Sequence, residues 1–116
     1  MILFLVRANL SVAMVAVIII STYPDKKSIL KIANMSVKEN LVGCVNFMKI
    51  NSIYTWQNKF ENTTEFLAFF KTTDKKKKLL KNKIKKSHPY KVPEIAELKV
   101  KSINKPYLDW LVTSTN

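Results

Sequence analysis

The chain has 116 residues, of which 47% are hydrophobic, and its formal net charge is +12. This length fits one domain rather than two, and the apolar content excludes an intrinsically disordered chain. Cys44 is the only cysteine and His88 the only histidine, so one chain forms neither an internal disulfide nor a Cys/His zinc cluster. The fold therefore does not depend on an oxidising compartment, and we expect the protein in the cytoplasm.

The first 24 residues are rich in apolar side chains and raise the question of a membrane segment. No charge lies between Ala8 and Pro24, but this stretch is shorter than the ~20 residues that a spanning helix needs. β-branched side chains dominate residues 15–20, which favours a buried strand over 14–21. We expect no membrane contact, and the alternative is a membrane-anchored protein that uses residues 1–22.

A helix is predicted to follow the turn at 23–25 and to end near residue 40. Apolar residues recur there at spacings of three and four, which is the period of one helix face. The predicted inner stripe is Ile29, Ile32, Ala33, Val37 and Leu41. Ser36 interrupts this stripe and weakens it.

Two apolar-rich regions in the middle of the chain predict strands, separated by polar residues that favour turns or bulges. The expected strands are 42–49, 52–56 and 65–73, and the expected breaks, turns or bulges are 50–51, 57–58 and 62–64. The chain has one glycine, so we expect asparagine in turns that need a positive φ.

A basic helix is predicted over 75–87, with Asp74 as its cap and Pro89 beyond its end. Its narrow apolar face is Leu79, Leu80 and Ile84, and eight lysines lie between residues 75 and 86. No arginine or aromatic residue that would read bases is interleaved with them. We therefore expect a solvated face with weak, salt-sensitive phosphate contacts and no specific nucleic-acid binding.

A strand over 94–101 and a short helix from Pro106 complete the chain. The resulting βαββαβ order with an extra C-terminal helix predicts an α+β, ferredoxin-like sandwich. In such a fold the helices cover one face of the sheet, yet the first strand and residues 66–70 are apolar on both faces. A second copy of the chain is the simplest cover for the other face.

Five motifs share the order and spacing of one known family. They are Cys44-Val45-Asn46, Ser52-Ile53-Tyr54-Thr55-Trp56, His88-Pro89-Tyr90, Pro93-Glu94-Ile95 and Tyr107-Leu108-Asp109-Trp110-Leu111. On these motifs residues 14–115 resemble the CutA family, which is linked to divalent-cation tolerance. Residues 1–13 lie outside the resemblance, so we expect a dispensable extension ahead of a CutA-like domain over 14–116, with Met14 as the start of the family match.

The resemblance implies a non-enzymatic homotrimer whose sheets pack around a threefold axis, with a role in binding divalent cations. Gly43 replaces the family's alanine before the cysteine, and Asn58 stands where the family usually has glycine. Asparagine tolerates the left-handed region, so the turn at Asn58 is expected to survive.

The candidate metal ligands are His88, Cys44, Glu61 and Glu94. Imidazole and thiolate favour copper over the earlier first-row metals, so copper or another divalent cation is the expected ligand. Because one chain has so few soft ligands, a complete site needs carboxylates or a neighbouring subunit. The structural alternatives are a buried core residue for Cys44 and a helix-end cap for His88.

The resemblance also implies that a second group of residues gathers at the cleft between subunits. These are Lys59, Glu65, Lys71, Thr72, Tyr90, Tyr54 and Trp56. They are interpreted either as intersubunit salt bridges and packing, or as the site of a small-molecule or anion sensor resembling the P-II signalling proteins. The carboxylates and lysines include no paired nucleophile and base, so they define no reaction.

Overall fold

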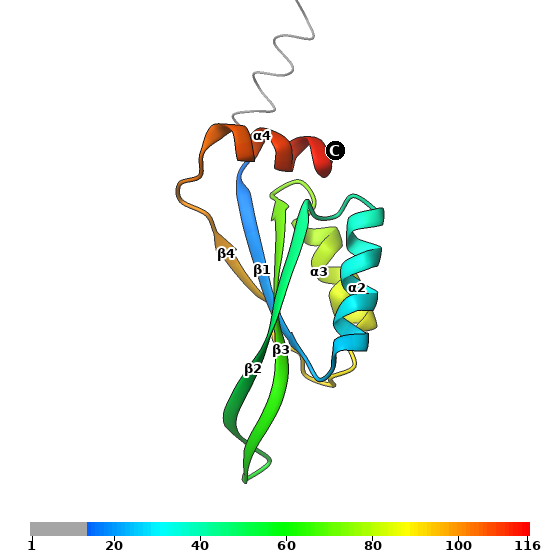
Figure 1. The fold of residues 1–116 in the computed structure, drawn as a ribbon, viewed down its shortest axis with the longest axis vertical. Coiled ribbons are helices and arrows are strands. Elements are labelled where there is room, and N and C mark those ends of the chain that lie inside the picture. The colour runs from blue at the N-terminus through cyan, green and yellow to red at the C-terminus, as the bar shows by residue number, and fades with distance from the viewer. Residues whose placement is uncertain (1–13) are drawn as a thin grey trace, which may run out of the picture.

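A four-stranded antiparallel sheet with helices on one face organises the structure, a computed structural model that describes residues 14–116. The elements are β1 (Ala16–Tyr23), α2 (Lys26–Lys38), β2 (Cys44–Trp56), β3 (Lys59–Thr73), α3 (Lys77–Ser87), β4 (Ala96–Lys99) and α4 (Lys105–Ser114). The strand order is β2-β3-β1-β4. Helices α2 and α3 lie side by side along the sheet, and α4 lies across its end (Figure 1). The predicted ferredoxin-like βαββαβ order with a C-terminal helix is confirmed.

The core lies between the sheet and the pair α2 and α3. Alternate residues of β1 point towards these helices, and Val17, Ile19 and Tyr23 are each at most 1% exposed. They pack with buried residues of both helices, among them Ile29 and Leu80. The β-branched run predicted as a buried strand is therefore β1, and its alternation fixes which side chains face the helices.

Both ends of α2 have specific capping interactions. The Asp25 carboxylate accepts a 2.8 Å hydrogen bond from the Ser28 N–H. At the other end Asn40 has φ 57°, and the N–H of Leu41 bonds to the Ser36 carbonyl at 2.9 Å, which is a Schellman arrangement. The inner stripe differs from the prediction in one place, since Ser36 is buried and Val37 is 47% exposed.

The hairpin formed by β2 and β3 is longer and more regular than the sequence indicated. β2 runs unbroken through residues 50–51, and β3 runs unbroken through residues 62–64, so the predicted break and turn there are wrong. The ribbon extends past the helices (Figure 1), and the polar residues Asn51, Asn62 and Thr64 are exposed without ending a strand. The predicted turn at Gln57 and Asn58 is confirmed as a two-residue loop in which both residues have positive φ.

Two further boundaries were predicted wrongly. Helix α3 begins at Lys77, and its N-cap, Lys76, makes no side-chain capping bond. Asp74 instead forms an ion pair with Lys77 at 3.2 Å, and Leu79, expected on the apolar face, is 55% exposed. β4 is confined to Ala96–Lys99 because only this segment pairs with β1.

The sheet has a second face, directed away from α2 and α3, that is also apolar. Pairing register places on it Ile18, Ile20, Met48, Leu67, Phe69 and Leu98. Met48 is 57% exposed and Leu98 is 47% exposed, whereas the other four are half-buried. We call these six residues the second apolar face. The two-sided apolar pattern expected from the sequence is present in the fold.

The structure bears on only part of the membrane hypothesis. Within residues 14–116 no helix is both long and apolar enough to cross a membrane. The portion of the 1–22 segment that the structure describes forms most of strand β1. The predicted extension over 1–13 lies outside the described residues.

Candidate functional site

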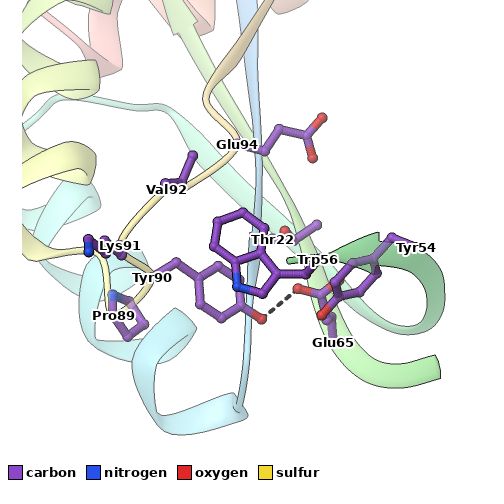
Figure 2. Close-up of a pocket in the computed structure, with 9 residues that line it drawn as sticks. All are labelled: Thr22, Tyr54, Trp56, Glu65, Pro89, Tyr90, Lys91, Val92 and Glu94. Atoms are coloured by element: carbon purple, nitrogen blue, oxygen red, sulfur yellow. Dashed lines mark hydrogen bonds between the residues drawn. The ribbon is translucent and has the colours of Figure 1, made fainter. Parts of the chain in front are cut away.

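A pocket of about 480 Å³ opens where the second face of the sheet meets the loop after α3. It is lined by Thr22, Tyr54, Trp56, Glu65, Pro89, Tyr90, Lys91, Val92 and Glu94 (Figure 2). Strand periodicity brings three of these together, since Tyr54 and Trp56 lie two residues apart on β2 and share a face with Glu65 of β3. Pro89 lies just beyond α3, and the chain then runs past this face.

Glu65 and Tyr90 form the most buried polar contact of the pocket. The Glu65 side chain is only 7% exposed, and the Tyr90 hydroxyl donates a 2.5 Å hydrogen bond to its Oε2 (Figure 2). Burial, and then this bond to Glu65, raise the pKa of Tyr90, so the phenol stays protonated and remains a donor. A carboxylate is thereby held at one side of a pocket that three aromatic rings line.

His88 lies behind Tyr90 and is held by the core. Its ring stacks on Tyr23 at a centroid distance of 4.2 Å, and its Nδ1 accepts the Tyr90 N–H at 3.0 Å. Because Nδ1 accepts, the neutral ring carries its proton on Nε2, which lies 3.1 Å from the Ser21 hydroxyl and donates to it. Burial lowers the pKa of His88, which favours this neutral form.

The four predicted metal ligands do not meet within one subunit. Glu94 lines the pocket, whereas Glu61 pairs with Tyr54 nearer the hairpin turn and does not line it. Cys44 pairs with Lys71, six residues along β3 from Glu65, which corresponds to roughly 20 Å of strand. Within residues 14–116 no group of three or more His, Cys, Asp or Glu side chains is placed to hold a metal ion.

The predicted cleft residues divide into two sets. Tyr54, Trp56, Glu65 and Tyr90 line the pocket. The other three lie elsewhere: Lys59 pairs with Trp56 beside the hairpin turn, Lys71 lies 5.9 Å from the centre of the Tyr107 ring, and Thr72 is buried. The Thr72 hydroxyl donates a 2.7 Å hydrogen bond to the Leu41 carbonyl, so its role within the subunit is structural.

Sequence reasoning missed Thr22, Val92 and the bond between His88 and Ser21. The alternation of β1 was the available signal for Thr22, since it puts Thr22 on the same face as Ile18 and Ile20. Val92 lies in a loop, and no periodicity predicts its direction. The pairing of His88 with Ser21 joins residues 67 positions apart, which only the folded chain brings together.

Comparison with known proteins identifies the relatives of this chain. The family described as CutA1 divalent ion tolerance protein matches residues 17–114. The divalent-cation tolerance protein CutA of Pyrococcus horikoshii is 36% identical over 99 residues, which is 85% of this chain and 97% of that protein. The crystal structure of P. horikoshii CutA1 superposes with a TM-score of 0.83 at 35% identity, over 86% of this chain and 98% of the other.

The description of a third relative names the cellular compartment of that protein. The Archaeoglobus fulgidus CutA structure, described as a periplasmic divalent cation tolerance protein, has a TM-score of 0.84 at 29% identity and covers 87% of this chain and 99% of its own. The motifs, the fold and these matches agree over the same residues. The chain belongs to the CutA1 family of divalent ion tolerance proteins.

Proposed function

We propose that this chain forms a homotrimer that binds divalent cations, copper first among them, and catalyses no reaction. The observation that carries the proposal is the second apolar face, on which Met48 and Leu98 are about half exposed. A stable soluble subunit rarely leaves so large an apolar sheet face in water, so a second copy is its natural cover. The family's link to divalent-cation tolerance supplies the ligand class.

The cation site is proposed to draw its ligands from more than one subunit. In a single subunit the described residues bring no three ligand side chains together. His88 also uses both ring nitrogens internally, so its coordination to copper requires the loss of one hydrogen bond. Cys44, Glu61 and Glu94 lie on or beside the face that the copies would share. Side chains of a neighbouring copy would therefore supply the ligands that one subunit lacks.

Two measurements test this proposal. Light scattering of the purified protein at micromolar concentration should give the mass of a trimer, and a folded monomer would refute the assembly. Calorimetric titration with divalent copper should show binding that weakens in Cys44→Ser or His88→Ala. Cys44→Ala and His88→Gln remove the same ligand groups with different changes in packing, so agreement between the two variants at a position assigns the loss to the ligand. Wild-type protein that binds no copper would refute the cation site while leaving the trimer intact.

A second candidate function is small-molecule binding at the pocket beside Glu65. Its volume of about 480 Å³ lies in the range of small-ligand sites, and its walls are mainly aromatic and apolar. The P-II signalling proteins offer a trimeric ferredoxin-like precedent by fold analogy only. Because Glu65 and Glu94 both line the pocket, a cationic or neutral ligand suits it better than an anion.

The compartment and the remaining partners are also proposals. We infer a cytoplasmic protein, because the fold contains a single cysteine and needs no disulfide. A periplasmic location, as described for the A. fulgidus relative, is the competing expectation, and cell fractionation separates the two. Lysines of α3 pair with acidic side chains, including Lys77 and Lys81 with Glu97, which supports a solvated face rather than a nucleic-acid site.

A further inference from the structure

We propose that the pocket beside Glu65 binds an ammonium group, carried either by a small organic amine or by a lysine side chain of a second copy of this chain. The inference rests on the second candidate function, binding at this pocket, and names the chemistry of the ligand. It does not depend on whether the protein binds copper.

The buried carboxylate of Glu65 is the first observation. Its side chain is 93% buried, and its hydrogen-bond partner among residues 14–116 is the Tyr90 hydroxyl. No lysine or arginine of the described chain forms an ion pair with it, although basic residues outnumber acidic ones by 20 to 8 in the sequence. A buried carboxylate is costly unless a cation or several donors compensate it, and one phenol supplies a single donor.

The charges around the pocket agree with a cationic ligand. Glu94 adds a second carboxylate to the lining, and Asp25 lies close enough to raise the pKa of Tyr90 slightly. Lys91 is the one basic residue of the lining, and Figure 2 shows its ammonium on the opposite side of the pocket from Glu65. The Glu65 carboxylate therefore retains acceptor capacity for N–H donors that enter from outside the subunit.

Aromatic rings supply the second, independent observation. Trp56, Tyr54 and Tyr90 all line the pocket, and the first two are 47% and 42% exposed. The π face of an aromatic ring attracts a cation within about 6 Å, and tryptophan does so most strongly. Aromatic walls beside a buried carboxylate suit a ligand with a charged nitrogen and an attached hydrocarbon, because each part meets its complementary surface.

Other ligand classes fit less well. An anion would be repelled by the Glu65 and Glu94 carboxylates. A bare divalent cation such as calcium takes six to eight oxygen ligands at about 2.3–2.6 Å, and two carboxylates in a pocket of about 480 Å³ do not supply them. A neutral ligand would leave the Glu65 charge uncompensated.

Two sources of the ammonium group are compatible with this geometry. A small amine would enter from solvent. A lysine of a neighbouring copy would enter if the copies pack on the second apolar face, because Thr22, Tyr54, Trp56 and Glu65 lie on that same side of the sheet. The chemistry at Glu65 is the same for both, so one set of variants tests them together.

The first arm of the experiment is calorimetric titration of the full chain with n-butylammonium chloride. Butanol and butyrate, which have the same hydrocarbon with a neutral or negative end, serve as ligand controls. Glu65→Gln keeps the side-chain shape and should weaken butylammonium binding roughly tenfold or more. Glu39→Gln, the same change at a carboxylate that pairs with Lys83 at the end of α2 and outside the pocket, should leave the affinity within about twofold.

The second arm measures assembly by light scattering over a dilution series. If a neighbour's lysine fills the pocket, butylammonium fails to bind the assembled protein. In that case Glu65→Gln should raise the concentration at which the assembly dissociates by roughly tenfold, and Glu39→Gln should not. Either pattern supports an ammonium site and identifies its source.

Trp56→Leu is the second variant, which leaves the bond between Glu65 and Tyr90 untouched. It should weaken the same binding or assembly roughly 3- to 30-fold, so the proposal can still be tested if Glu65→Gln fails to fold.

The proposal is overturned if butanol or butyrate binds as well as butylammonium. It is also overturned if butylammonium does not bind and neither Glu65→Gln nor Trp56→Leu alters assembly. Copper titration and the mass of the wild type are measured separately, so failure of the proposed function is distinguishable.

Discussion

Replacing Gly43 by alanine should destabilise the fold by overpacking the contact between the start of β2 and α4. Gly43 has no positive φ, so the chain's single glycine is not needed for backbone conformation. A Cβ built at this position would lie 2.6 Å from Leu111 Cδ1 and 3.0 Å from Trp110 Cζ3. Carbon atoms in a packed core lie about 3.5–4.0 Å apart, so the neighbours must move.

The ability of each neighbour to move sets the size of the effect. Trp110 is 46% exposed, so its ring is able to shift into solvent. Leu111 is 1% exposed, so its side chain must repack against the small cavity that it lines or α4 itself must shift outward. Overpacking of this kind costs about 1–3 kcal/mol. The resemblance implies alanine at the position of Gly43 in the family, so related subunits are expected to accommodate a Cβ there, which favours about 1–2 kcal/mol.

Guanidinium denaturation at one fixed protein concentration measures this cost, because the stability of an assembly depends on concentration. For a domain of this size the melting temperature should fall by roughly 4–8 °C per kcal/mol. Leu111→Ala removes the clashing atom, so Gly43→Ala should cost much less in that background, with a coupling of about 1 kcal/mol. A cost below about 0.5 kcal/mol with no coupling to Leu111 would refute the argument from close approach.

The remaining predictions concern assembly, capping and pH. Phe69→Lys, on the second apolar face, should convert the assembly to a folded monomer by light scattering and circular dichroism, whereas Leu79→Lys, an exposed apolar residue on α3, should leave the mass unchanged. Asn40→Ala removes the short polar side chain that lets asparagine tolerate the left-handed region and should lower the unfolding free energy by about 1 kcal/mol, whereas Asn40→Gly should not lower it. Because burial lowers the pKa of His88, the unfolded chain binds more protons between the folded pKa and 6.5, so stability should fall as pH drops below about 6.5. His88→Gln should flatten that fall in chemical denaturation measured from pH 7 to 5, and an unchanged slope would contradict it.

The fold class was predictable because local patterns and element order agreed. The β-branched run became β1, and the stripe from Ile29 to Leu41 became the buried face and C-terminal cap of α2. Gln57 and Asn58 formed the predicted turn, since a two-residue hairpin loop needs positive φ and asparagine tolerates it. These features depend on residues close together in sequence.

The errors lie where local composition and tertiary context disagree. Asn51 and residues 62–64 are polar, and polarity usually indicates a turn, but here they lie in paired strands of a ribbon that extends beyond the helices. Their backbone hydrogen bonds are satisfied by the partner strand, so solvent-exposed side chains do not interrupt it. Asp74 has the chemistry of a helix cap, yet its carboxylate pairs with Lys77 and the helix begins later.

The candidate site was predictable only in part for the same reason. Tyr54, Trp56 and Glu65 lie at alternating positions on paired strands, so register alone places them on one face. The metal ligands were grouped by chemical type, which carries no information about distance. Cys44 and Glu61 consequently lie away from Glu94, although all three were assigned to one site.

The segment His88-Pro89-Tyr90 links the core to the pocket, which gives His88 a positioning role whatever cation the protein binds. Stacking on Tyr23 and the bond to Ser21 fix the imidazole, and its Nδ1 then fixes the Tyr90 backbone. Tyr90 in turn directs its hydroxyl to Glu65. Protonation of His88 at low pH would place a proton on Nδ1 and remove the acceptor of the Tyr90 N–H. The loop that carries Tyr90 would then lose its hydrogen bond to His88. The orientation of the Glu65 carboxylate therefore depends, through Tyr90, on a neutral His88 ring.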